Sequence, residues 1–148
     1  MKLDLQKLDR KFQTLKEYVQ SLREYGLLPH DLYFGQRSNR SGAKYDLQIA
    51  IQCCIDIANM LIAAEGWRQP RDYFDAFRIL GENGVVPEAF LPTLEEMVKT
   101  RNMLAHVYER VDDVRVNRII REDLDDFGRF TRHVLDYVRT QGYLSEEE

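Results

Sequence analysis

Three residues in the second half of the chain have side chains that together could cleave a phosphodiester. Arg101 and Asn102 are adjacent, and His106 lies four positions after Asn102. Histidine can act as the general base on an RNA 2′-hydroxyl or as the general acid for the leaving oxygen. Arginine is permanently charged and bidentate, which suits a phosphate whose negative charge grows in the transition state. Asparagine can orient the imidazole or donate to the phosphate, so the set predicts phosphodiester cleavage without a metal ion.

The spacing of these residues makes a geometric demand on the helix predicted to carry them. Tyr108 lies seven positions after Arg101, so the two share one line of the helix, about 20° apart. Asn102 and His106 form a second line, and a regular helix would separate Arg101 from His106 by roughly 140°. The two could meet on one substrate only if the helix bends or unwinds between them, or if a second subunit completes the site.

The residue types alone also allow a purely structural interpretation of this segment. An arginine at a helix edge often extends its charge to solvent, and a histidine near a helix C-terminus favours the helix dipole there. No metal site is predicted, because the three histidines are far apart and the sequence has no Cys-x-x-Cys or His-Glu-x-x-His motif. The sequence has no glycine-rich phosphate loop either, and no cofactor is expected.

The hydrophobic pattern predicts that this segment belongs to an all-α, four- to five-helix up-down bundle. Apolar residues from Leu5 to Leu22 recur at spacings of 3 and 4, which is typical of an amphipathic helix that ends near Gly26. After a connector at 30–43, the stretch 44–65 is apolar nearly all round and is expected to be the central helix. The other helices are expected at about residues 71–80, from Pro92 to about 109, and from a cap at Asp112-Asp113 to about 140.

The whole chain is expected to form a single domain at residues 1–143 with an acidic tail at 144–148. Its 148 residues include 21 Lys and Arg against 25 Asp and Glu, a formal net charge of −4. The hydrophobic share of 44% excludes intrinsic disorder. An acidic total argues against a protein that grips nucleic acid over its whole surface, but it allows a local basic site.

The cysteine usage and the N-terminus indicate a cytoplasmic protein. Cys53 and Cys54 are adjacent, which rarely allows a disulfide, so they are predicted to be buried thiols in a reducing compartment. The first residues have no uninterrupted apolar core, so no signal peptide is predicted. The most apolar stretch, Leu47 to Ala64, contains four polar residues, and no membrane span is expected.

The segment at 101–108 resembles the Arg-x4-His-x-Tyr motif of HepT-type HEPN-domain toxins. Arg101, His106 and Tyr108 occupy its three defined positions. The run Ile55-Asp56-Ile57-Ala58-Asn59 on an apolar helix and the restart at Pro87-Glu88 extend the similarity, which covers about Lys2 to Tyr143.

The resemblance implies the toxin of a type VII-like toxin–antitoxin pair: a homodimeric endoribonuclease whose two motifs face a shared cleft. Arg101 and His106 would be catalytic and Asn102 supporting. The implied partner is a MntA-type minimal nucleotidyltransferase antitoxin, which would neutralise the toxin by transferring AMP to Tyr108. Two other functions stay open: a non-catalytic HEPN subunit that presents substrate to a nucleotidyltransferase, and a helical scaffold whose motif is structural.

Two further groups of polar residues have alternative interpretations. A polar stripe on the apolar helix consists of Gln52, Asp56 and Asn59. It could be a buried hydrogen-bond network, or Asp56 could face Arg101 or His106 and orient it. Several basic residues lie around the motif. They could form a solvated, salt-bridged face, or they could form a rim that guides RNA to the cleft. The rim residues are Lys99, Arg110, Arg115 and Arg118.

Overall fold

The computed structural model describes residues 3–106 and 110–143, and within these residues the chain is all helical and has no strand. This confirms the predicted all-α class. The helices are α1 (Leu5–Gly26), α2 (His30–Gly35), α3 (Arg37–Glu65), α4 (Tyr73–Glu82), the short 3₁₀ helix η1 (Glu88–Phe90), α5 (Leu91–Ala105), α6 (Asp113–Glu122) and α7 (Asp125–Thr140).

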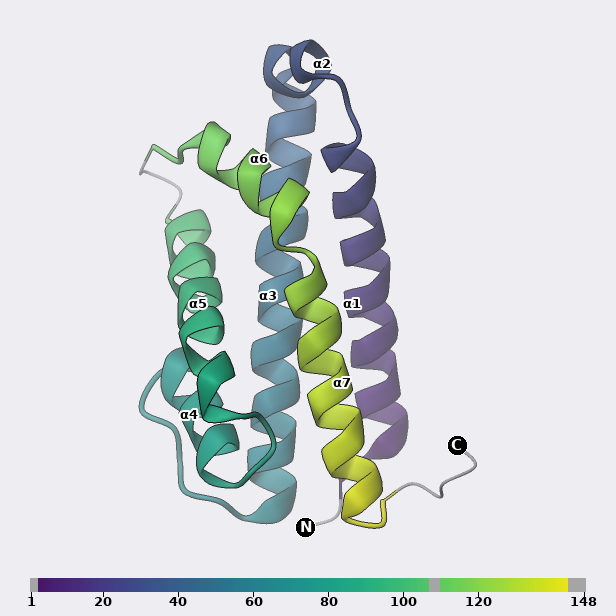
Figure 1. Cartoon of the computed structure of the whole chain (residues 1–148), viewed down its shortest axis with the longest axis vertical. Helices are drawn as coiled ribbons and strands as arrows, with labels where there is room; N and C mark the ends of the chain where they lie inside the picture. The colour runs from purple at the N-terminus through teal and green to yellow at the C-terminus, as the bar shows by residue number, and fades with distance from the viewer. Residues whose placement is uncertain (1–2, 107–109, 144–148) are drawn as a thin grey trace.

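The long helices run alternately up and down around α3 (Figure 1). Helix α3 contacts every other α-helix of the described residues, and α1 lies along much of its length. Helices α4 and α5 cover another face of α3, while α6 crosses its upper part and α7 returns beside it. The end of α5 therefore lies near the start of α6, at the same end of the bundle as α2.

The central position of α3 explains its apolar sequence. By length and composition α3 could cross a membrane, but 61% of its most apolar window is buried inside the bundle. Leu47, Ile51, Ile55 and Leu61 are almost fully buried, and each such side chain contributes roughly 1.5–3 kcal/mol to folding. Its left-handed C-cap is Gly66, with φ 69°, a conformation that glycine adopts without steric cost.

Helix α3 begins earlier than the sequence predicts, at Arg37 instead of about residue 44. The polar residues before position 43 are typical of a loop, but two of them satisfy the carbonyls that α2 leaves unpaired. Asn39 donates its side-chain amide to the carbonyl of Leu32 at 3.0 Å, and Arg40 donates to the carbonyl of Phe34. These bonds let the chain re-enter a helix directly after α2.

The predicted last helix is divided into α6 and α7. Asp112 caps α6 as expected, because its carboxylate accepts from the backbone N–H groups of Val114 and Arg115. The helix ends at Glu122, and Asp125 starts the next one. The break changes the direction of the chain, so that the apolar faces of both short helices are buried in the same core.

Candidate functional site

Arg101 lies in the last turns of α5 and is held by contacts from two other parts of the chain. Its Nε donates to Oε1 of Gln52 on α3 at 3.0 Å. Its guanidinium carbon lies 4.8 Å from the ring centroid of Tyr73, a cation–π contact worth about 0.5–1 kcal/mol at an exposed site. Its Nη1 donates to Oδ1 of the exposed Asn102 at 3.3 Å. The half-buried Arg101 side chain is thus held on its inner side, where Gln52 of α3 and Tyr73 of α4 contact it.

Asp56 does not contact Arg101; it contacts the residue that does. Oδ1 of Asp56 accepts from Nε2 of Gln52 at 2.9 Å, and Oδ2 pairs with Nζ of Lys11 on α1 at 2.9 Å. The hydrogen bond to Asp56 raises the pKa of Lys11. Asn59, the third member of the predicted polar stripe, is exposed, so only two of the three residues belong to a network.

Helix α5 ends between Arg101 and His106. The sequence predicts a helix to about residue 109, but Ala105 is its last residue and His106 adopts extended angles of φ −84° and ψ 92°. The structure thus meets the demand that the helix unwind between the two residues. The His106 side chain is exposed, and the described ranges contain no hydrogen-bond or ion-pair partner for it. Tyr108 and the predicted tail at 144–148 lie outside the described residues.

Tyr73 is held next to Arg101 by a buried carboxylate two positions later. Asp75 is 1% exposed and accepts two 2.8 Å hydrogen bonds from the Arg68 guanidinium. It also accepts from the backbone N–H of Arg71 at 2.9 Å and from Nε of Arg78 at 3.1 Å. The Arg68 guanidinium and the Arg71 N–H hold the pKa of Asp75 well below its usual range. This cluster fixes the loop before α4 and therefore the position of Tyr73.

Replacing Asp75 with asparagine is expected to destabilise the protein by about 2 kcal/mol at neutral pH, because charge-assisted hydrogen bonds are lost. The Asp75 pKa is lowered by folding, so its stabilisation is complete above the pKa of the unfolded chain and is lost as the pH falls. The stability difference between the wild type and the variant should therefore begin to shrink at about pH 4 and shrink further as the pH falls toward the lowered pKa of Asp75. Urea unfolding at about pH 7 and at about pH 3 measures the difference in unfolding free energy. The exposed Asp9→Asn on α1 is the control. An equal difference at both pH values would contradict the assignment.

The predicted basic rim divides between two sides of α5. Lys99 lies on the Tyr73 side, beside Asn102, and its Nζ is 3.5 Å from both Glu95 and Glu96. Arg115 and Arg118 of α6 instead line a cavity of about 290 Å³ between α3, α5, α6 and α7.

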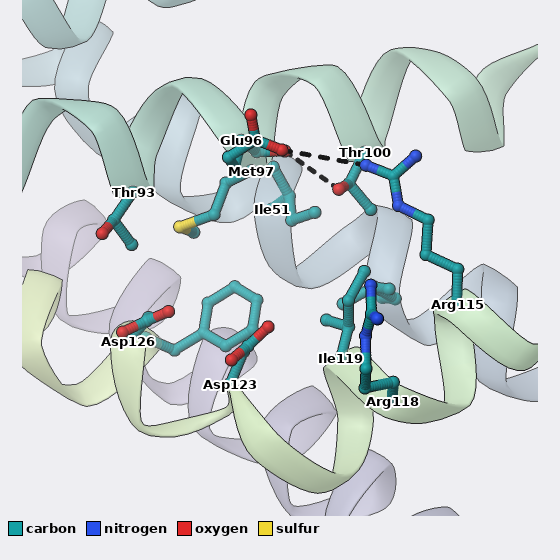
Figure 2. Close-up of a pocket in the computed structure, with 12 residues that line it drawn as sticks. Ile51, Thr93, Glu96, Met97, Thr100, Arg115, Arg118, Ile119, Asp123 and Asp126 are labelled. Atoms are coloured by element: carbon teal, nitrogen blue, oxygen red, sulfur yellow. Dashed lines mark hydrogen bonds and ion pairs between the residues drawn. The ribbon is translucent and has the colours of Figure 1, made fainter.

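Figure 2 shows this cavity, in which Arg115 reaches across toward Glu96 of α5. Thr100 lines the cavity, whereas the next residue, Arg101, turns toward Tyr73. Arg110 is exposed, as is Arg118. Two of the four rim residues, Lys99 and Arg115, therefore form ion pairs with acidic side chains of α5. The described residues contain no group of three or more His, Cys, Asp or Glu that could hold a metal ion.

A family model described as ribonuclease HepT-like matches residues 14–134. The chain belongs to the ribonuclease HepT-like family. It is 29% identical over 85 residues to the mRNA nuclease HepT of Shewanella oneidensis, a match that covers 57% of this chain and 64% of the nuclease. It is 34% identical over 98 residues to a protein of Archaeoglobus fulgidus provisionally named an RNase, with 66% of this chain and 74% of that protein covered.

The fold of this HepT-like chain is also that of solved HEPN toxins. A tri-AMPylated HEPN toxin of Shewanella oneidensis, in complex with an MNT antitoxin, superposes with a TM-score of 0.78 at 23% identity. That match covers 87% of this chain and 96% of the toxin. YutE, a cytosolic protein of unknown function from Bacillus subtilis, superposes with a TM-score of 0.83 at 19% identity and 99% coverage of both chains.

Two contacts of the HepT-like site were not apparent from the sequence. Nothing in the sequence connects Tyr73 with the motif, yet its ring is 37% exposed and stacks with Arg101. Gln52 was identified only as a member of the α3 stripe. Its spacing of four residues from Asp56 was a visible signal for their hydrogen bond, but the contact with Arg101 spans 49 positions.

Proposed function

We propose that this HepT-like protein is an endoribonuclease toxin that cleaves RNA with Arg101 and His106. The end of α5 carries the proposal: Arg101 is held along its inner side, and an exposed His106 follows the last helical residue. Membership in the ribonuclease HepT-like family supports RNA as the substrate. Asn102, exposed beside Arg101 and bonded to it, is proposed to support the guanidinium.

The proposed reaction needs no metal ion. The 2′-oxygen of one nucleotide attacks the adjacent phosphorus, forming a P–O2′ bond as the P–O5′ bond breaks. His106 accepts the 2′-hydroxyl proton or supplies a proton to the leaving 5′-oxygen, and water exchanges the other proton. The Arg101 guanidinium stabilises the negative charge that grows on the phosphate oxygens. The products are a 2′,3′-cyclic phosphate and a 5′-hydroxyl.

The proposed toxin acts as a homodimer in the cytoplasm, with the two motifs facing one cleft. A dimer would allow His106 of the partner subunit to act with Arg101 of the first chain. The exposed His106, which follows the last residue of α5, is accessible to a second chain. The exposed Arg110 and Arg118 are proposed to guide RNA toward the cleft, with the ion-paired Lys99 and Arg115 contributing less.

The proposed partner is a MntA-type minimal nucleotidyltransferase that transfers AMP to Tyr108. The tri-AMPylated relative in complex with its antitoxin supports this regulation. An AMP group on Tyr108 would add a phosphate and a purine two residues after His106. The negative phosphate would compete with RNA for the arginine, and the bulk would obstruct the cleft.

Co-expression with a MntA-type nucleotidyltransferase is expected to raise the intact mass of the chain by one or more AMP units. Tyr108→Phe should remove the increase, because phenylalanine has no hydroxyl to modify, whereas Tyr45→Phe, at an exposed tyrosine of α3, should keep it. Cells that express the chain alone should lose intact RNA and stop growing. An increase that survives Tyr108→Phe would disprove the modification site. Intact RNA with full AMP transfer would instead indicate the non-catalytic binding subunit.

A further inference from the structure

The side-chain amide of Gln52 is bonded at both ends, and its two partners allow only one orientation. Its Oε1 accepts from Arg101 Nε at 3.0 Å, and its Nε2 donates to Asp56 Oδ1 at 2.9 Å. An ionised carboxylate only accepts hydrogen bonds, and a guanidinium only donates them. The amide oxygen must therefore face Arg101, and the amide nitrogen must face Asp56.

Lys11 fixes the other end of this chain of hydrogen bonds. Its ammonium is 2.9 Å from Oδ2 of Asp56. Hydrogen bonds thus connect α1, α3 and α5: Lys11 and Gln52 both donate to Asp56, and Gln52 accepts from Arg101. The side chains of Lys11 and Asp56 are 35% and 34% exposed. Ion pairs this exposed contribute little to stability, so the stability of the bundle does not explain the arrangement.

The contacts on Arg101 leave one part of its guanidinium available. Gln52 uses Nε, Asn102 uses one N–H of Nη1, and Tyr73 covers a face of the group. Within the described ranges no hydrogen bond uses Nη2. The remaining N–H of Nη1 and both N–H groups of Nη2 thus have no hydrogen-bond partner among the described residues, and one N–H from each nitrogen matches the bidentate geometry of a phosphate.

We propose that Gln52 is a positioning residue that holds Arg101 ready for a phosphate of the RNA, and that Asp56 and Lys11 fix which end of the Gln52 amide faces Arg101. The inference rests on the proposed ribonuclease function and deepens it. An arginine that is ordered before the substrate arrives loses less conformational freedom on binding. Loss of this order is expected to reduce cleavage about tenfold.

The first test replaces Gln52 with methionine, which keeps the length of the side chain and removes both hydrogen bonds. The control is Gln48→Met, one turn earlier on α3 at a half-buried position. Single-turnover cleavage at subsaturating RNA, where the rate includes the cost of binding, should fall about tenfold in Gln52→Met and stay at the wild-type rate in Gln48→Met. Both variants should unfold at similar temperatures. Equal cleavage rates in the two variants would overturn the inference.

The second test reverses the direction of the amide. In Asp56→Asn the new oxygen faces Lys11, so its NH₂ faces Gln52, and the Gln52 amide must turn its own NH₂ toward the Arg101 N–H. Cleavage should fall about tenfold. Adding Lys11→Met removes the donor that forces this orientation, and cleavage should recover toward the wild-type rate. A double variant no more active than Asp56→Asn would contradict the role of Lys11 and Asp56.

A readout without RNA separates this inference from the ribonuclease proposal. The Nε–H resonance of Arg101 in the full-length protein should be slow to exchange with water in the wild type and in Gln48→Met, and fast in Gln52→Met. This pattern in a protein that leaves RNA intact would disprove the ribonuclease and retain Gln52 as the anchor of Arg101. Equal exchange in all three proteins would disprove the anchor, whatever the cleavage result.

Discussion

Arg101→Ala is expected to reduce RNA cleavage about 10²–10³-fold, the effect typical of removing one donor to the charge of a transition state. The guanidinium is held by Gln52 and Tyr73 before any substrate arrives, so its loss removes a preorganised positive charge. Stability should change little, because Arg101 is only half-buried and its hydrogen-bond partners remain accessible to water. The measurement is single-turnover cleavage of a labelled RNA, with the unfolding temperature of each variant recorded beside it.

Two further variants make the Arg101 result specific. Arg101→Lys keeps the positive charge but loses the Nε–H that Gln52 accepts and the fork that grips a phosphate. It should therefore fall between the wild type and Arg101→Ala. Arg132→Ala removes an exposed arginine from α7 and should leave cleavage unchanged. If Arg101→Ala cleaves RNA at the rate of Arg132→Ala, Arg101 has no catalytic role.

His106→Ala is expected to reduce cleavage by about 10²–10⁴-fold, the contribution typical of a positioned general acid or base. The pH dependence of the rate should change as well, because the limb that reports the imidazole disappears with it. The exposed His30 provides the matched control, since His30→Ala removes an imidazole from α2. A His106→Ala protein with the pH profile of the wild type would show that another group moves the proton.

The two variants also test whether the site is shared between subunits. Arg101→Ala and His106→Ala chains can be mixed under conditions that allow dimers to exchange. If each site takes Arg101 from one chain and His106 from the other, the mixed dimer contains one complete site and regains cleavage. If both residues act within one chain, no mixture regains activity. Recovery would establish the proposed homodimer and a site that is shared between its two chains.

Most of the bundle could be predicted because its helices have regular local signals. The 3-and-4 spacing from Leu5 to Leu22 predicted α1, which ends at Gly26 as expected. The apolar run of α3 predicted the central helix, and Asp112 predicted the cap of α6. These features depend on residues within one or two turns of each other, so the sequence alone contains the information.

The features that were missed are the end of α5 and the contacts between distant residues. Nothing in the pattern near Ala105 stops the helix, because Leu104 continues the apolar stripe. The pairing of Arg101 with Gln52 requires α3 and α5 to pack in one particular register, and Tyr73 reaches Arg101 only because the Arg68–Asp75 cluster orders the intervening loop. Residue type and spacing predicted the candidate catalytic groups, whereas their supports could be identified only from the packed helices.

Cleavage of RNA by the purified chain, prepared without any nucleotidyltransferase and in the presence of EDTA, tests the central claim most directly. The RNA carries a label at each end, so that the chemistry of both new ends can be read. The proposed reaction predicts fragments that end in a 2′,3′-cyclic phosphate and fragments that begin with a 5′-hydroxyl. The Arg101→Ala and His106→Ala variants should each produce them at only a small fraction of the wild-type rate. RNA that stays intact with the folded wild-type protein, or fragments that appear equally with both variants, would contradict the ribonuclease assignment.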